Sequence, residues 1–263
     1  MVPFEFSFIE KLNEVQARLC QEIKIKAADF EDLVNLNMDD LDKVFCPAIV
    51  LATGQACGDA GQKFEALAVI VQLIYIANQV HNLMKDDNDL AEDLRQFPVL
   101  VGDLLYGRFF LELCRENLLT FLEPLAQVIG IMSEGGIARW LSRSEKLETE
   151  ELLQIINKES AALTAKAANL SAELAGVSLP IQNKLQAYGR ELGLAWGAWK
   201  EGLENKVVQA ILQKASDILQ EIKLSSQLKI QPLYEVFHYL SGCLNQDNAP
   251  KESALQCLEG ENA

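Results

Sequence analysis

Two apolar stretches with helical spacing are the most informative parts of this chain: QLIYIANQVHNLMKD (Gln72–Asp86) and YGRELGLAWGAWKEGLE (Tyr188–Glu204). Each contains apolar and small residues on most of its helical faces and ends in polar or charged residues. A helix that is apolar on most faces has to be buried among other helices. The two stretches therefore predict the inner helices of a bundle.

The rest of the chain follows the same pattern. Seven prolines are widely spaced, and the segments between them are rich in Leu, Ala, Glu, Gln and Lys with a helical apolar period, while strand signals are almost absent. We predict an all-α fold of about ten helices, with one domain over residues 1–244 and a polar tail over 245–263. The expected helices span 4–26, 48–57, 61–84, 99–117, 121–141, 149–175, 181–203, 207–222 and 228–244.

Several residues suit the ends of these helices. Pro98 and Pro180 fit first turns, and Thr149, followed by Glu151, offers a capping residue. Gly58 and Gly176 stand where a helix can end.

Charge and cysteine content restrict the function. A formal net charge of −15 would repel nucleic acid and anionic membranes, so we expect no nucleic-acid partner. Six cysteines lack Cys-x-x-Cys pairs, and neither a signal peptide nor an apolar run of about 18 residues is evident. These features predict a cytoplasmic protein without a transmembrane segment.

Four segments between residues 45 and 202 occur in a characteristic order: FCPAIVLATGQACGDAGQKFEALAVIVQLIY, QVHNLMKD, VLVGDLLYGRFF, and NKESAALTAKAANLSAEL followed by YGRELGLAWGAWKEG. In this order they resemble the trans-isoprenyl (polyprenyl) diphosphate synthases. The resemblance implies an isoprenoid (terpenoid) synthase-type helical bundle. Enzymes of that family join isopentenyl diphosphate to an allylic diphosphate.

The first metal-binding motif of the family is degenerate here. Family members place Asp-Asp-x-x-Asp after a histidine, and aspartates at i and i+4 share a helix face and bind the magnesium ions that bridge the allylic diphosphate. This chain keeps His81 but continues with Asn82, and of the aspartates only the last, Asp86, remains.

The second motif departs further. Lys200 stands where the resemblance places the first aspartate, followed by Glu201 and Glu204. An ammonium group there would repel a magnesium ion, or would itself supply positive charge and pair with a nearby glutamate.

The phosphate-binding segment Gly-Lys-Arg-x-Arg-Pro has also changed. The residues before Pro47 read Asp-Lys-Val-Phe-Cys, so both arginines, which in the family grip phosphate oxygens, are apolar here. Lys43 and Lys158 remain as possible diphosphate contacts. After Glu204 the family's lid over the site is missing.

An acidic cluster one turn beyond the first motif offers an alternative. Asp89 and Asp93 have i, i+4 spacing, which allows a shifted magnesium site. Such clusters are more often solvated faces that interact with the helix dipole. We therefore expect no metal cofactor, with Mg²⁺ as the alternative.

The combined losses predict a noncatalytic or regulatory subunit, similar to the small component of two-component heptaprenyl diphosphate synthases. Its partner would be a catalytic prenyl diphosphate synthase subunit or a second copy of the chain. The apolar faces of 99–110 and 118–131 are candidate interfaces or, alternatively, intramolecular core. Two alternatives remain: an active prenyltransferase with an atypical metal site, and a prenyl- or lipid-binding module.

Overall fold

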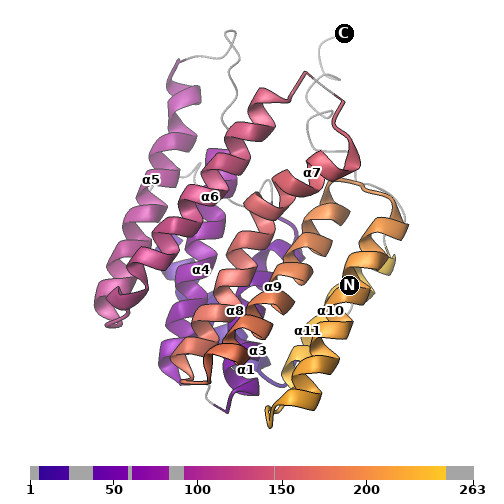
Figure 1. The fold of residues 1–263 in the computed structure, drawn as a ribbon. Coiled ribbons are helices and arrows are strands. Elements are labelled where there is room, and N and C mark those ends of the chain that lie inside the picture. Colours follow the sequence, from indigo (N-terminus) through magenta and orange to yellow (C-terminus); the bar gives the residue numbers. More distant parts are fainter. Residues whose placement is uncertain (1–5, 24–37, 59–60, 83–91, 145, 247–263) are drawn as a thin grey trace.

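The computed structural model describes residues 6–23, 38–58, 61–82, 92–144 and 146–246, which contain helices and no strand. A 3-10 turn (Leu119–Phe121) precedes α6, and a π-helical turn (Asn157–Ala161) joins α7 to α8. The helices are α1 (Ile9–Ile23), α3 (Asp40–Ala56), α4 (Gln62–His81), α5 (Glu92–Arg115), α6 (Leu122–Leu141), α7 (Thr149–Ile156), α8 (Ala162–Leu174), α9 (Leu179–Lys200), α10 (Asn205–Ser225) and α11 (Gln231–Gln246) (Figure 1). The all-α bundle expected from the sequence is confirmed.

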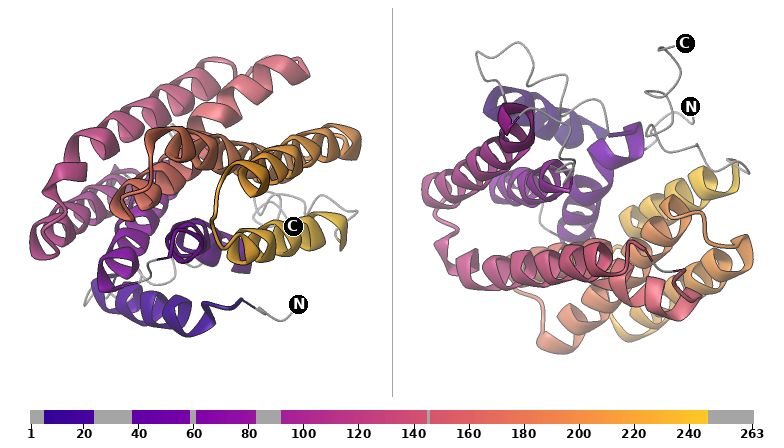
Figure 2. Two further views of the ribbon diagram at one scale, coloured as in Figure 1. Left: turned by 60° about the horizontal axis from the view of Figure 1, so that its bottom comes forward. Right: turned by 90° about the horizontal axis from the view of Figure 1, so that it is seen from above.

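Helices α3 and α4 form the interior of the bundle. Helix α3 contacts α1, α4, α8 and α11 and is seen nearly end-on in Figure 2. Helix α4 is long and apolar enough to cross a membrane by length and composition alone, but 83% of its apolar window is buried inside the bundle. Its hydrophobicity is therefore explained by its place in the core.

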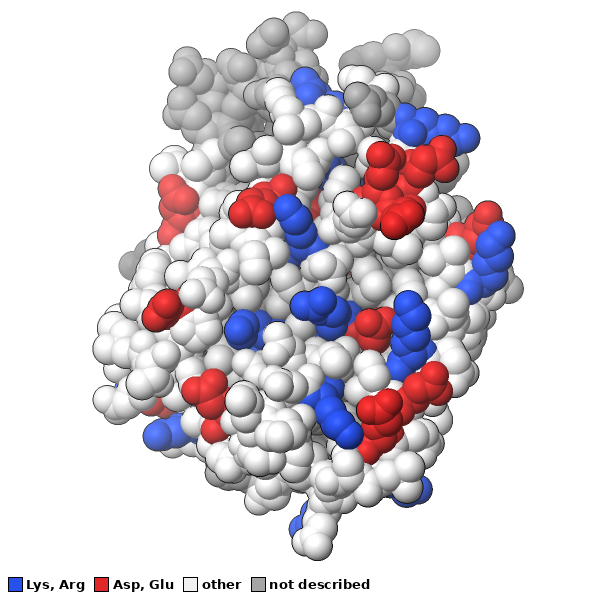
Figure 3. Space-filling view, in the orientation of Figure 1, with Lys and Arg blue, Asp and Glu red and all other residues white. Residues whose placement is uncertain are grey.

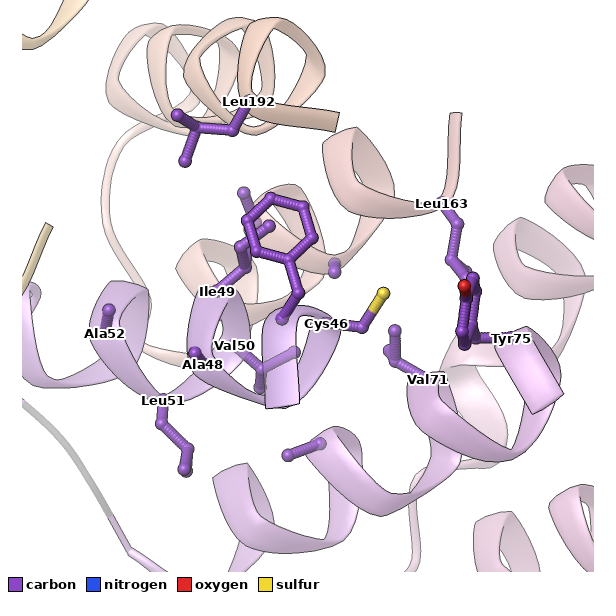
Figure 4. Close-up of a cluster of buried hydrophobic side chains, with 14 of the residues drawn as sticks. Cys46, Ala48, Ile49, Val50, Leu51, Ala52, Val71, Tyr75, Leu163 and Leu192 are labelled. Carbon is purple, nitrogen blue, oxygen red and sulfur yellow. The ribbon is translucent and has the colours of Figure 1, made fainter. Parts of the chain in front are cut away.

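The core is built from side chains of helices that are far apart in the sequence. Figure 4 shows a cluster that includes Cys46 of α3, Tyr75 of α4, Leu163 of α8 and Leu192 of α9. Some buried polar groups have a partner from another helix: the Ser171 hydroxyl donates to the carbonyl of Val50 at 2.7 Å. Pairing of this kind removes the cost of burying a polar group.

The predicted ends of four helices are confirmed or nearly so. Gly58 and Gly176 follow α3 and α8 with φ of 92° and 70°, a conformation that glycine adopts without strain. Pro180 lies in the first turn of α9. The cap of α7 is one residue earlier than predicted, because Glu148 rather than Thr149 forms a capping box with Glu151.

Two predicted starts are wrong. Helix α3 begins at Asp40 instead of residue 48, because Asp39 and Asp42 form a capping box upstream of Pro47. Helix α5 begins at Glu92, so Pro98 lies inside it rather than in its first turn.

Helices α5 and α6 lie at one edge of the bundle (Figures 1 and 2). Of the eleven large apolar residues exposed in the described part of the chain, nine belong to these helices or to the turn between them. We call this the α5–α6 surface. It consists of Leu100, Leu104, Phe110, Leu111, Leu119, Ile131, Ile137, Trp140 and Leu141.

Candidate functional site

The ends of α4, α6 and α9 and the π turn surround a cavity of about 170 Å³. Exposed residues such as Asn82 and Glu201 are part of its wall, so the cavity opens to solvent. This is the place where both degenerate motifs end. Its lining consists of Tyr75, Gln79, Asn82, Arg139, Ile156, Glu159, Ser160, Trp196, Gly197, Lys200 and Glu201.

Lys200 does not face an open metal site. Its Nζ lies 2.6 Å from Oδ1 of Asp42, a residue that is 1% exposed, and the Tyr75 hydroxyl donates to the same oxygen at 2.8 Å. The other carboxylate oxygen of Asp42 accepts the main-chain N–H of Asp39 at 3.1 Å. Both oxygens are therefore satisfied, as a buried carboxylate requires.

Asp42 also affects its neighbours. Burial and the adjacent carboxylate together raise the pKa of Tyr75 well above its usual value, so its phenol stays protonated and remains a donor. The Lys200 ammonium lies 5.4 Å from the ring centre of Trp196, within the range of a cation–π contact. Asp42 was not predicted from the sequence to be a site residue. Its only signal was a carboxylate where the family motif has glycine.

The lost arginines are replaced by core residues. Val44 and Cys46 are 8% and 0% exposed and pack inside the bundle. Burial raises the pKa of the Cys46 thiol, which is therefore uncharged. Neither residue offers a hydrogen-bond donor that could replace a guanidinium group.

A second set of ion pairs crosses the cavity. The Arg139 guanidinium donates to both oxygens of Glu159, at 3.0 and 2.9 Å from Nε and at 2.6 Å from Nη2. Its Nη1 also donates to Glu201 at 3.1 Å. Burial by itself lowers the pKa of Arg139, but these two carboxylates raise it above its usual value. The guanidinium is therefore charged and already has its partners.

The π turn brings Glu159 to this place. A π turn inserts one residue into a helix and rotates the side chains that follow. Glycines on α6 and α9 allow these helices to pack closely against this segment. A Cβ at Gly135 would lie 2.7 Å from Cγ of Glu159, and a Cβ at Gly197 would lie 2.4 Å from Cγ2 of Ile156. Arg139 and Glu159 were missed from the sequence because their pairing depends on this local geometry.

His81 faces α5 rather than the cavity. Its Nε2 lies 3.4 Å from the carbonyl oxygen of Val99 and 3.5 Å from Oδ1 of Asp103. The ring packs so closely on α5 that a Cβ at Gly102 would come within 2.0 Å of it. Burial and Asp103 raise the pKa of Tyr106, the aromatic neighbour of His81, to about 12. His81 thus holds α4 against α5.

Of the residues predicted for the site, the structure brings Asn82, Lys200 and Glu201 together. Four others do not line the cavity: Lys43, His81, Lys158 and Glu204. Lys158 pairs with Glu134 at 3.0 Å, and Glu204 pairs with Lys206 at 2.6 Å. Asp86 and Asp89 lie outside the described residues, and Asp93 lies in α5 but its side chain is not described.

The described residues around the cavity do not fit a magnesium ion. Mg²⁺ takes carboxylate oxygens and water in an octahedral arrangement. Here the Glu201 and Glu159 carboxylates are bound to Arg139, and Lys200 brings a positive charge to the same place. No group of three or more His, Cys, Asp or Glu able to hold a metal is found in the described part of the chain.

Comparison with known proteins agrees with this architecture. Residues 29–223 match the family model described as Polyprenyl synthetase, and the chain belongs to this family. It is 25% identical over 205 residues to octaprenyl diphosphate synthase of Escherichia coli (strain K12), which covers 72% of this chain and 64% of that protein. The chain thus spans less than two thirds of this relative's length.

Two solved structures show the fold at lower identity. A decaprenyl diphosphate synthase from Rhodobacter capsulatus matches with a TM-score of 0.71 at 17% identity, over 91% of this chain and 96% of that chain. The geranyl diphosphate synthase small subunit from Antirrhinum majus matches with a TM-score of 0.69 at 15% identity, over 89% and 96%. The isoprenoid synthase-type bundle expected from the resemblance is confirmed.

Proposed function

We propose that this chain is a noncatalytic member of the polyprenyl synthetase family that acts as a subunit of a prenyl diphosphate synthase. One observation carries the proposal: Lys200, at the place of a metal-binding aspartate, is held at 2.6 Å by the buried Asp42. The described cationic and anionic groups of the site pair with each other, and no cluster of free carboxylates for magnesium is found among the described residues.

The electrostatics explain why chemistry is not expected. Cleavage of an allylic diphosphate builds negative charge on the leaving group, and metal ions and free cations have to offset it. In this cavity Arg139 and Lys200 are the cations, and three carboxylates already neutralise them. On the face in Figure 3 the basic side chains are likewise interspersed with acidic ones.

The α5–α6 surface supports the subunit role. Large apolar residues gathered on one edge of a molecule mark an interaction site. Two glycines on the same helices, Gly107 and Gly130, have nothing within 4 Å of a Cβ built on them. A glycine inside a helix costs up to about 1 kcal/mol relative to alanine, so a close approach by another chain would explain both.

The partner we propose is a catalytic polyprenyl synthetase from the same organism, with a second copy of this chain as the alternative. The small subunit from Antirrhinum majus has the same fold, and its description names it as one component of a synthase. By analogy, this chain would shape or stabilise an active partner. Such an interface would bury more than about 1,000 Å².

Association measured by analytical ultracentrifugation tests this proposal. The chain should form a complex with such a synthase, and Leu104→Asp or Phe110→Asp should weaken the complex at least tenfold.

Phe109 is fully buried and is not suited to the test, because Asp there would disrupt the core. Leu179→Asp and Leu224→Asp are matched controls, since both leucines are exposed elsewhere and should leave association unchanged. A chain that stays monomeric alone and with every synthase tested would contradict the subunit role.

A further inference from the structure

We propose that the cavity between α4, α6, α9 and the π turn binds an uncharged molecule with a hydroxyl group and a short apolar part. This inference rests on the proposed function, because it concerns the same site after loss of its metal and diphosphate chemistry. The proposed ligand is an uncharged molecule instead of a diphosphate.

The charge of the cavity points to a neutral ligand. Arg139 is paired with Glu159 and Glu201, and Lys200 is paired with Asp42, so two cations face three carboxylates. A multiply charged anion would have to break these pairs and leave a buried carboxylate without its partner, which is strongly unfavourable. A neutral molecule disturbs none of them.

Uncharged hydrogen-bonding groups remain available in the wall. The side chains of Gln79, Asn82 and Ser160 line the cavity and form no side-chain hydrogen bond with another described residue. Two amides and a hydroxyl can donate to and accept from a ligand hydroxyl. Ile156 and the ring of Trp196 supply apolar surface beside them. The wall therefore combines charged side chains that already have partners, three uncharged polar side chains without a described partner and a smaller apolar part.

The size of the cavity limits the ligand. A volume of about 170 Å³ is close to that of an engineered protein cavity of about 150 Å³ that binds benzene. The space therefore suits a molecule of about six non-hydrogen atoms, such as a five-carbon alcohol. A diphosphate together with its metal ions and a prenyl chain would exceed it.

Binding of 3-methyl-3-buten-1-ol to the full chain, followed by NMR or calorimetry, tests the inference against pyrophosphate with Mg²⁺. We expect saturable binding of the alcohol with a dissociation constant in the roughly millimolar range and no binding of pyrophosphate. Ser160→Leu should fill the cavity and weaken alcohol binding at least tenfold. Gln79→Leu provides a second variant if Ser160→Leu does not fold. Ser144→Leu, at an exposed position outside the cavity, is the control and should bind as the unchanged chain does.

Each outcome has a distinct meaning. Saturable alcohol binding that is lost on cavity filling supports the inference. If neither probe binds, or if alcohol binding survives both leucine variants, the inference is wrong and the proposed subunit role still stands. If pyrophosphate binds with Mg²⁺ at the cavity, both the inference and the noncatalytic assignment are wrong.

Discussion

Asp42 and Lys200 stand 158 positions apart in the sequence and form one contact. Each residue alone departs from the family pattern. Asp42 stands where the phosphate-binding segment has glycine, and Lys200 stands where the second motif has its first aspartate. Together they neutralise each other beside Tyr75. The two side chains differ in burial: that of Asp42 is 2% exposed, and that of Lys200 is 31% exposed.

Lys200→Met should destabilise the chain by about 2 kcal/mol, because it leaves the Asp42 carboxylate buried without a counter-charge. This loss of stability is smaller than that expected for breaking a fully buried ion pair, because the Lys200 side chain is partly exposed to solvent. Asp42→Asn should cost less, since Lys200 can turn to water. The double variant should lose less than the sum of the two, and urea denaturation measures all three.

Lys206→Met is the matched control for this cycle. Lys206 pairs with Glu204 at 2.6 Å, but both side chains are more than 70% exposed. A pair of this kind contributes little, so the free energy of unfolding should change by less than about 0.5 kcal/mol. Additive losses for Asp42→Asn and Lys200→Met would show that the buried pair has no energetic role.

At the scale of helices, glycines on α9 set the distance to α8 and the π turn. A Cβ at Gly193 would lie 2.0 Å from Oγ1 of Thr164 and 2.9 Å from Cα of Ala161. The second contact is with the backbone, so a rotamer change cannot relieve it. Gly189 and Gly197 lie four residues to either side and meet α8 and the π turn in the same way. The short spacing keeps Lys200, at the end of α9, within reach of Asp42.

Gly193→Ala should therefore destabilise the chain by about 1–3 kcal/mol through overpacking. Gly130→Ala, on the exposed face of α6, should instead stabilise the isolated chain by about 0.5–1 kcal/mol, because no atom lies near the new Cβ and alanine favours the helix. Thermal unfolding of the two variants compares them directly. Equal effects at both positions would contradict the close packing of α9.

The sequence predicted the helices better than the site. Apolar periodicity gave α4, α6 and α9 closely, because buried helices keep their pattern over many turns. The start of α3 was missed because its capping box depends on two aspartates upstream of a proline. The order of the motifs along the chain was enough to predict that Asn82, Lys200 and Glu201 lie near each other. It could not predict Asp42, Arg139 and Glu159, whose contacts depend on the tertiary fold and on the register change at the π turn.

At the scale of the whole molecule, two features support the proposed subunit role. The described charged side chains of the cavity are paired in ion pairs, while exposed apolar surface among the described residues is concentrated at the α5–α6 edge. The first argues against chemistry within this chain, and the second argues for an exposed contact with another. A net charge of −15 also disfavours self-association over binding to a less acidic partner.

We propose that the chain on its own does not transfer prenyl groups. The most direct test incubates the purified chain with isopentenyl diphosphate, farnesyl diphosphate and Mg²⁺ and follows labelled product, with a catalytic polyprenyl synthetase as positive control. Because the described part of the site holds no metal-binding cluster and its cations are paired with carboxylates, the rate should fall by several orders of magnitude below that of the control, to background. Magnesium-dependent turnover by the chain alone, at the rate of an ordinary synthase, would contradict the account.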